Sequence, residues 1–285
     1  MYAPIRAMEI GCNVQIYKED EILRIYTLNY CDNIYNNNAI KWGYTSIKEQ
    51  SFENKKALLY DRLIVKKEGG LYKIIDCNNT KEIVPDKYTD IQFLEVDQNF
   101  IVTSSFGKMG IINLEGDVLI EPKYDNIHVL DKEQKLYVVE KDKKFGIVKR
   151  ENEVVIPIQY DSIGCDISSI EINGVIKKVN PVTTIDACEG IVVKENDKYG
   201  VINIKTNTTV VPFQVDSIYS IENNKKELEY FMLYNGEELN IINMLIEQGI
   251  IKNPEEVIED GNTIVQDNNT VITNSITNTV SNNIG

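Results

Sequence analysis

The sequence contains very little histidine, no long apolar run and no closely spaced cysteines. His128 is the only histidine in the chain, which rules out a metal site built from several histidines. No window approaches the run of about 18 apolar residues that a spanning helix needs, so we expect no membrane span and no membrane partner. The N-terminal segment lacks a basic start followed by an apolar stretch, so we expect no signal peptide.

The cysteines are odd in number and scattered along the chain. They are Cys12, Cys31, Cys77, Cys165 and Cys188. A disulfide framework favours an even number, and a thiolate metal site needs paired ligands at short spacing. We therefore expect reduced thiols, no metal and no cofactor.

Basic charge is scarce relative to acidic charge. The 44 acidic and 30 basic residues give a net charge of -14. An acidic surface repels phosphate, which argues against a nucleic-acid partner. The acidic residues are scattered, so solubility explains the charge better than mimicry of a nucleic acid does. Apolar residues recur throughout the 285-residue chain, which indicates a folded protein.

Motifs for catalysis are also missing. His128, in "NIHVLDKE", has no serine or cysteine motif beside it, so we interpret it as a loop or strand-edge residue. The "EGG" at 68–70 joins two strands and does not form a phosphate loop. We predict no enzyme activity, and no catalytic, metal-binding or other binding residue can be named.

The chain does contain a repeated pattern. Its clearest copies are "GKMGIINLEGDVLIEPKYDNI" at 107–127, "KKFGIVKRENEVVIPIQYDSI" at 143–163 and "DKYGVINIKTNTTVVPFQVDSI" at 197–218. A marker position holds Gly110, Gly146 and Gly200, with Lys73 and Asn240 in two further copies. Eight residues before the marker stand Val65, Val102, Val138, Val192 and Met232. A large residue precedes the marker in every copy, and two β-branched residues follow it.

Three further columns follow the marker in four copies. They are the prolines Pro85, Pro122, Pro157 and Pro212, then Tyr88, Tyr124, Tyr160 and Val215, then Asp90, Asp125, Asp161 and Asp216. We interpret the aspartates as turn residues whose side chains accept backbone N–H bonds. We interpret the tyrosines as packing residues between repeats, with stacking on sugar rings as the alternative.

Each copy predicts a β-hairpin followed by a third strand. The proline should lie at a strand end or a bulge, and the glycine should mark a close backbone approach where a Cβ would clash. One copy cannot bury its apolar face alone, so neighbouring copies must stack. The predicted fold is mainly β, with tandem three-stranded β-meander repeats in an open array or a small propeller-like arrangement, and a short α-helical C-terminal region.

These columns resemble the WG-repeat (KWG) family over residues about 62–243. A literal "KWG" occurs once, at residues 41–43, either as a decayed leading copy or as an unrelated segment. In the clear copies Tyr, Met or Phe stands where the family has Trp. The resemblance implies an all-β repeat architecture, no shared enzymatic activity and a role as a surface or scaffold in bacterial proteins.

The two ends of the chain differ from the repeats. Near the N-terminus, strands with a turn at residues 18–20 are favoured over a helix at 21–35. After the last hairpin, a period near 3.6 predicts a helix that Gly249 ends. Its apolar face would hold Leu239, Ile242, Leu245 and Ile246, and a second short helix would begin at Asn253.

The predicted domains are an N-terminal β-rich segment at 1–60, a WG-like β-repeat domain at 61–236, a helical segment at 237–260 and an Asn/Thr-rich tail at 261–285. The repeat domain carries an insertion at about 164–185. The tail is interpreted either as a mobile terminus or as a segment that docks on a partner or in an oligomer.

The stretch "MLIEQGIIKNPEEV" resembles a short helical element of clostridial and phage-encoded cell-wall lytic proteins. This resemblance suggests a phage or mobile-element background, and with it a cytoplasmic or virion-associated location.

Three function classes follow from these observations. The first is a non-catalytic repeat scaffold that binds a protein partner or assembles with itself, as a structural component of a phage or bacterial assembly. The second is a carbohydrate or cell-wall binding module, for which a glycan is the partner. The third, an enzyme with a site between the N-terminal segment and the insertion, has the least support.

Overall fold

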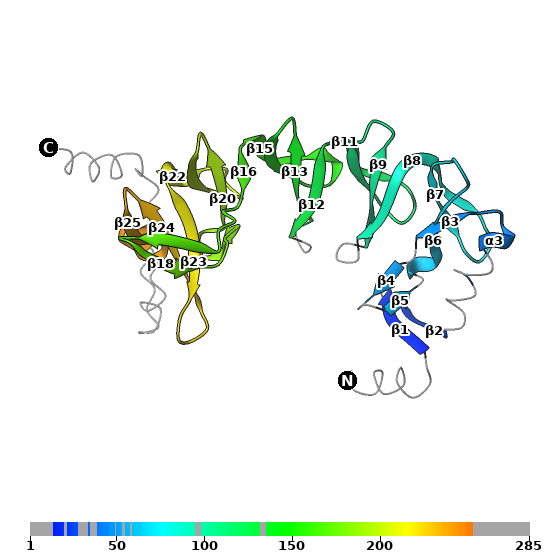
Figure 1. Ribbon diagram of the computed structural model, residues 1–285, viewed down its shortest axis with the longest axis horizontal. Helices are drawn as coiled ribbons and strands as arrows, with labels where there is room; N and C mark the ends of the chain where they lie inside the picture. The colour runs from blue at the N-terminus through cyan, green and yellow to red at the C-terminus, as the bar shows by residue number, and fades with distance from the viewer. Residues whose placement is uncertain are drawn as a thin grey trace, which may run out of the picture. The chain divides into compact units, whose positions relative to one another are not determined.

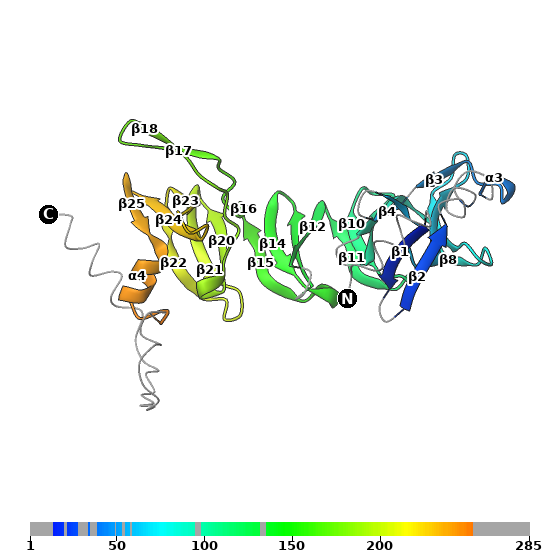
Figure 2. The ribbon, with the colours of Figure 1, turned by 90° about the horizontal axis from the view of Figure 1, so that it is seen from below.

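The computed structural model describes residues 14–19, 22–27, 34, 39–48, 50–52, 55–57, 59–94, 98–131 and 135–252. The chain divides into two compact units, Met1–Gln159 and Tyr160–Gly285, each of which is described by itself. Both units consist mainly of antiparallel β-sheets, so the predicted mainly-β fold class is confirmed (Figures 1 and 2). The boundary between the units lies inside the region expected to form one repeat domain.

The first unit begins with a short antiparallel hairpin. Strand β1 (Val14–Glu19) pairs with β2 (Ile22–Thr27), which confirms the predicted N-terminal strands. Lys18 pairs with Leu23 and Glu19 with Ile22, so Lys18 and Glu19 belong to β1 and not to the turn predicted at residues 18–20. Short elements follow: α3 (Ala39–Lys41), β3 (Ser46–Lys48), β4 (Gln50–Phe52), β5 (Lys55–Ala57) and η2 (Leu59–Asp61).

Two larger sheets complete the first unit. The seven-stranded sheet has the order β11-β10-β9-β8-β7-β6-β3, and the four-stranded sheet has the order β12-β13-β14-β15. Their strands are β6 (Arg62–Lys66), β7 (Tyr72–Asp76), β8 (Glu82–Leu94), β9 (Asn99–Ser104), β10 (Met109–Ile112), β11 (Val118–Tyr124), β12 (Asn126–Asp131), β13 (Leu136–Lys141), β14 (Lys144–Val148) and β15 (Val154–Tyr160), with η3 (Arg150–Asn152) before β15.

The second unit holds the insertion and the last repeats. Its elements are β16 (Ser162–Ile163), β17 (Ser169–Ile172), β18 (Val175–Lys178), β19 (Thr184–Ile185), η4 (Asp186–Cys188), β20 (Gly190–Glu195), β21 (Lys198–Asn203), β22 (Thr209–Val215), β23 (Ser217–Glu222), β24 (Leu228–Tyr234), β25 (Glu237–Asn240) and α4 (Ile241–Glu247). One sheet runs β16-β20-β21-β22 with β19 beside β20, another runs β23-β24-β25, and β17 pairs with β18 alone.

The predicted meanders are present as β6–β8 (repeat 1), β9–β11 (repeat 2), β13–β15 (repeat 3) and β20–β22 (repeat 4), with β24–β25 as repeat 5. The repeating unit nevertheless contains more than the three predicted strands. The chain after each Tyr-Asp pair forms a further strand that pairs with the next repeat, as β12 does with β13 and the end of β8 does with β9. Each repeat therefore completes its sheet with a strand that the preceding copy supplies.

The glycine column lies where a bulge crosses the neighbouring strand, as predicted. Between the pairs Met109–Tyr124 and Ile111–Ile120, two steps along β10 face four along β11, and Pro122 lies within the longer side. A Cβ on Gly110 would be 2.5 Å from the Ile120 carbonyl oxygen. Gly146 and Gly200 would meet the carbonyl oxygens of the equivalent strands at 2.7 and 2.8 Å. At these three positions a Cβ would overlap the backbone of the neighbouring strand, which favours glycine.

The valine column pairs directly with the marker column only in the repeats with longer hairpin turns. Val102 pairs with Gly110, but Val139 rather than Val138 pairs with Gly146. In the same way Val193 rather than Val192 pairs with Gly200, and Met232 pairs with Leu239 rather than Asn240. The spacing of eight residues in the sequence does not fix the cross-strand partner, because the hairpin turns differ in length. A turn that is one residue shorter pairs the marker with the neighbouring residue, whose side chain lies on the other face of the sheet.

Neighbouring repeats share hydrophobic cores, which confirms the predicted stacking within each unit. One cluster joins Val84 of repeat 1 to Phe100 of repeat 2. Another joins Tyr124 of repeat 2 to Tyr137 of repeat 3. Burying these apolar faces against one another is the main stabilising contribution, at roughly 25 cal/mol per Å² removed from water.

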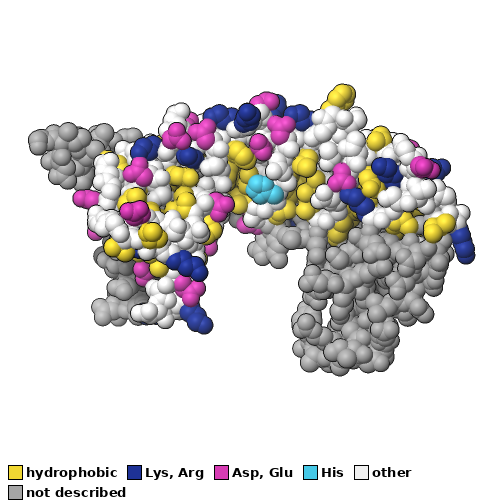
Figure 3. All heavy atoms as spheres, in the orientation of Figure 1, with side chains coloured by type: hydrophobic (Ala, Val, Ile, Leu, Met, Phe, Trp, Pro, Cys, Tyr) yellow, Lys and Arg dark blue, Asp and Glu magenta, His cyan; other side chains and the backbone are white. Residues whose placement is uncertain are grey.

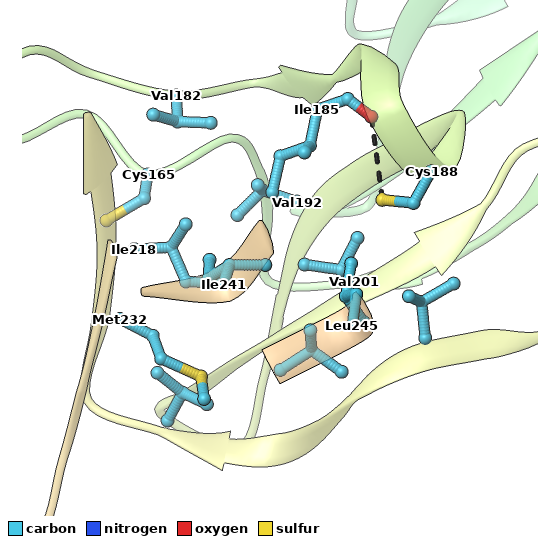
Figure 4. Close-up of a cluster of buried hydrophobic side chains, with 13 residues drawn as sticks. Cys165, Val182, Ile185, Cys188, Val192, Val201, Ile218, Met232, Ile241 and Leu245 are labelled. Atoms are coloured by element: carbon cyan, nitrogen blue, oxygen red, sulfur yellow. Dashed lines mark hydrogen bonds between the residues drawn. The ribbon is translucent and has the colours of Figure 1, made fainter. Parts of the chain in front are cut away.

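In the second unit the core lies between repeat 4, the β23–β25 sheet and α4 (Figure 4). Val201 of β21, Met232 of β24 and Leu245 of α4 point toward one another there. In the sequence, the helix follows β25 directly, where the earlier repeats continue to their third strand.

The C-terminal helix begins later than predicted. Residues 237–240 form β25, and the side chain of Asn240 caps α4 by accepting a bond from the Asn243 N–H at 3.0 Å. Of the four residues predicted for its apolar face, Leu239 lies on β25 and not on the helix. Leu245 is buried, Ile242 and Ile246 are only half-buried, and Ile241 is the other buried residue of the helix.

The end of the helix follows the prediction. Gly249 has a φ of +70°, and the N–H groups of Gly249 and Ile250 bond back to Ile246 and Leu245. The helix predicted from Asn253 and the tail at 261–285 lie outside the described residues.

The "KWG" segment forms part of a cap on repeat 1. Strand β3 pairs with β6 as the supplied strand does in later repeats, and Trp42 packs against a cluster that contains Leu63 and Val65. The residues from 39 to 48 thus supply one helical turn and one strand, and not a complete leading copy.

Candidate interaction surfaces

The residues considered for chemistry occupy structural positions. His128 is exposed on β12, a strand at the edge of its sheet, as the sequence suggested. Cys165 and Cys188 are buried free thiols, as expected for reduced cysteines, and Cys77 is buried as well. Burial raises the pKa of Cys188 to about 11, so its thiol is protonated and unreactive at neutral pH. Cys12 and Cys31 lie outside the described residues.

Within the described part of the chain, no group of three or more potential ligands could hold a metal ion. No helix there is long and apolar enough to cross a membrane.

The tyrosine column packs inside the molecule. Tyr88, Tyr124 and Tyr160 are all at most 6% exposed, and Tyr160 stacks on Phe213 with ring centroids 5.8 Å apart. This confirms the interpretation that these rings pack between strands. Their faces are covered by protein, so the column does not offer a platform for sugar rings.

The aspartate column links neighbouring hairpins. Asp125 accepts a 2.8 Å bond from the backbone N–H of Asp142, at the turn of the β13–β14 hairpin, and also pairs with Lys108 Nζ. The hydrogen bonds from Lys108 and Asp142 hold the pKa of Asp125 below its ordinary value. The predicted acceptance of a backbone N–H is correct, but the N–H belongs to the next repeat and not to a local turn.

Each of the other aspartates makes one of these two kinds of contact, with a backbone N–H or with a lysine. Asp161 accepts a 2.8 Å bond from the N–H of Asn196 at the β20–β21 turn, and Asp216 pairs with Lys198. Asp90 pairs with Lys48 of β3. The aspartate column therefore makes contacts between strands, both within a repeat and from one repeat to the next.

The turn of the β9–β10 hairpin displays an exposed aromatic residue. Phe106 is 90% exposed, the most of any large hydrophobic side chain described. The turn around it is held by backbone bonds from Gly107 N–H to Ser104 O (2.9 Å) and from Ser104 N–H to Lys108 O (2.8 Å). A third bond runs from Lys108 N–H to the Ser104 hydroxyl at 3.2 Å. The ring is thus presented to solvent on an ordered turn.

A second exposed element is the hairpin of the insertion, β17–β18, called the insertion hairpin below. Val175 and Ile176 at its tip are 59% and 74% exposed. Lys177 Nζ lies 2.7 Å from Glu238 Oε2 on β25. The Tyr219 hydroxyl of β23 donates to Glu238 Oε1 at 2.6 Å. Glu238 therefore connects three strands that are far apart in the sequence.

The electrostatics of this contact favour a charged carboxylate. Burial opposes ionisation of Glu238, but the bonds from Lys177 and Tyr219 outweigh it, and the pKa of the carboxyl lies below its ordinary value. Burial and the bond to Glu238 raise the pKa of Tyr219, so the phenol stays protonated and can donate.

The surrounding surface shows no mass of one charge. On the face drawn in Figure 3, acidic and basic side chains are interspersed, with single hydrophobic side chains between them. This agrees with the scattered acidic residues of the sequence and gives no indication of a nucleic-acid site.

Neither surface residue was identified from the sequence. The signal for Phe106 is an aromatic side chain between Ser105 and Gly107, in a turn where the other repeats have charged residues. Glu238 had no such signal, because its partners lie 61 and 19 residues away and are brought together only by the fold.

The WG containing repeat family model matches residues 109–145, 145–168 and 199–225. A search of curated proteins found no match. The family match ends before the helical element that resembles lytic proteins. Repeat 1 lies outside the matched residues but has the same strand order and the same bulge, between the pairs Tyr72–Tyr88 and Ile74–Val84.

Several solved structures are similar at low identity. The computationally designed Ika8 protein is 12% identical with a TM-score of 0.25, over 69% of this chain and 73% of that one. BamB from Moraxella catarrhalis is 9% identical with a TM-score of 0.30, over 63% of this chain and 60% of that one. The N-terminal domain of Nup159 is 9% identical with a TM-score of 0.28, over 80% and 72%. TM-scores this low do not establish a shared fold. The family match and the repeated strand pattern agree: residues 109–168 and 199–225 match WG repeats, and they form part of an array of antiparallel β-repeats.

Proposed function

We propose that the chain is a non-catalytic repeat scaffold that binds a protein partner, with Phe106 as a contact residue. The observation that carries this proposal is the 90% exposure of Phe106 on an ordered hairpin turn. A rigid aromatic side chain loses little conformational entropy on binding, and aromatic residues supply much of the energy of protein interfaces. An apolar ring in contact with water has no stabilising role of its own in the folded chain.

The wider context is part of the same proposal. A place within a phage or bacterial assembly is supported by the repeat architecture and by the short resemblance to phage-encoded proteins. Docking or self-assembly through residues 261–285 is an additional component, and these residues lie outside the described part of the chain. The cell-wall alternative loses its main support because the tyrosine column is buried.

The test is an affinity purification with the full chain and two matched variants. Phe106→Ser removes the exposed ring, and Leu228→Ser removes a 50% exposed leucine of the second unit as a control. We expect a partner that the wild type and Leu228→Ser retain, and that binds Phe106→Ser about 30-fold more weakly, as for an interface hot spot.

Equal retention by all three proteins would contradict the role of Phe106. Retention of the wild type on purified peptidoglycan, without a protein partner, would favour the cell-wall module instead.

A further inference from the structure

The insertion hairpin differs from every other hairpin of the second unit in how it is held. Its two strands pair only with each other, around a turn at Asn173 and Gly174 with φ values of 51° and 76°. A two-stranded hairpin without further support is at best marginally stable in water. Its closed position therefore depends on the contacts that it makes with the rest of the unit.

The base of the insertion hairpin is fixed. Cys165 and Val182 form a β-bridge and belong to the core of the second unit, together with Ile185. Closer to the arm, Asn180 and Ser220 exchange backbone bonds of 2.9 and 3.1 Å at the edge of β23. Both ends of the insertion are thus anchored in the unit.

The arm itself is not anchored in that core. No residue from 169 to 178 belongs to the core cluster or packs against it, although Ile167 does. Figures 1 and 2 both show the hairpin beside β23, β24 and β25. Ile170 and Ile172 are half-buried, and the two tip residues are exposed. The polar contact of Lys177 with Glu238 therefore fastens the arm to β25, next to the buried Val179 at its base.

This fastening lies on the face of the last sheet that points away from the core. Ile218 and Met232 point into the core cluster, so their neighbours Tyr219 and Phe231 point to the opposite face. The rings of Tyr219 and Phe231 stack with centroids 6.0 Å apart. Tyr219 is fully buried there, and its hydroxyl shares Glu238 with Lys177.

We propose that the insertion hairpin is a strap that Glu238 fastens to the outer face of the last sheet, beside Tyr219, and that the arm opens when this fastening is lost. The base at residues 165 and 182 stays in place while the arm moves. In the closed state one carboxylate holds both the arm, through Lys177, and the sheet, through Tyr219. Loss of that charge weakens both contacts at once, because hydrogen bonds to a neutral acceptor are weaker than those to a carboxylate. This inference concerns the second unit and does not depend on the proposed role of Phe106.

The experiment measures tryptic cleavage after Lys177 and Lys178 in the folded full chain, with mass spectrometry to identify the cut bonds. A paired strand must leave its neighbour before a protease can cleave it. Glu238→Gln keeps the size of the side chain but removes its charge. Glu237→Gln, next to it on β25 and exposed, is the matched control.

We expect Glu238→Gln to speed cleavage at these two bonds by about fivefold, the change that about 1 kcal/mol produces in an equilibrium. Glu237→Gln should match the wild type. Cleavage after Lys198, within β21, should keep the wild-type rate in both variants, which would show that the rest of the unit stays folded.

Equal cleavage rates in Glu238→Gln and Glu237→Gln would overturn the proposal. If Glu238→Gln also speeds cleavage after Lys198, the unit itself is loosened, and Tyr219→Phe decides the question. That variant keeps the buried ring and loses only the hydroxyl. Faster cleavage confined to Lys177 and Lys178 supports the strap, and an unchanged rate contradicts it.

Discussion

The stacked repeats of the first unit and the insertion hairpin of the second unit are both antiparallel β-hairpins, but they are held by different forces. The β9–β10 hairpin buries apolar residues on both faces, in the cores that repeat 2 shares with repeat 1 and with repeat 3, and the β13–β14 hairpin buries Tyr137 and Val139 in the second of these cores. The insertion hairpin exposes Val175 and Ile176 and depends on the Lys177–Glu238 contact.

This difference follows from where the apolar residues stand. In repeats 1 and 2 the hairpin strands lie between two cores, so removing one buried side chain leaves a cavity between packed strands. In the insertion hairpin, one face of the two strands is exposed to water. The free energy that holds the hairpin against the last sheet is therefore small and depends on a few polar contacts. The repeats form the rigid part of the molecule and the insertion hairpin the movable part.

The largest effect is expected from a core tyrosine. Tyr124 is 1% exposed in the cluster shared by repeats 2 and 3. Tyr124→Ala should lower the free energy of unfolding by about 3–5 kcal/mol, as for other large aromatic truncations. Urea unfolding followed by circular dichroism measures this change. Val118→Ala on the same strand, where the side chain is 42% exposed, should cost less than about 1 kcal/mol.

Equal losses in these two variants would show that the shared core does not hold the repeats together.

A smaller but still large effect is expected at the glycine column. Gly110→Ala would place a Cβ 2.5 Å from the Ile120 carbonyl oxygen and 2.7 Å from Pro122 N. Relieving that overlap requires the backbone of β11 to shift, which should cost about 1–3 kcal/mol. The unfolding midpoint in urea reports the loss.

Lys73→Ala is the matched control, because Lys73 holds the same column in repeat 1, where a Cβ is already accommodated. Its ammonium group lies 2.5 Å from Glu82 Oε2, and Glu82 is partly exposed. Losing this pair should cost at most about 1 kcal/mol. If Gly110→Ala is no more destabilising than Lys73→Ala, the explanation of the column by close backbone approach is wrong.

The smallest effect is a pH dependence at Asp125. Its pKa is lower in the folded chain, through Lys108 and the Asp142 N–H, than the value of about 3.9 expected in the unfolded chain. The stabilisation is therefore present above the unfolded pKa and is lost as the pH falls through the folded pKa. Between pH 6 and pH 3, the wild type should lose more stability than Asp125→Asn in urea titrations. Parallel curves for the two proteins would contradict the proposed link between hairpins.

Much of the repeat architecture was predictable because its physics is local and repeated. The glycine and proline columns predicted the bulge, and the tyrosine column predicted packing between strands. Gly249 predicted the end of the helix, because a positive φ and its backbone bonds concern only neighbouring residues.

The errors have one common cause, which is pairing between residues distant in the chain. The strand that each copy supplies to the next was missed because periodicity alone does not show which copy a strand pairs with. The aspartates were assigned to local turns, whereas Asp125 bonds to a turn 17 residues away. Residues 237–240 were assigned to the helix because Leu239 fits its spacing, but they pair with β24 instead. The contact of Glu238 with Lys177 and Tyr219 likewise arises only from the fold.

Amide hydrogen exchange of the full chain at neutral pH, followed by mass spectrometry, tests the contrast between stacked repeats and fastened hairpin most directly. We expect the amides of β9, β10, β13 and β14 to exchange at least about 100-fold more slowly than those of β17 and β18, since core strands open with far larger free energies than peripheral hairpins. Equal protection of the insertion hairpin and the stacked strands would contradict the view that one is movable and the other rigid.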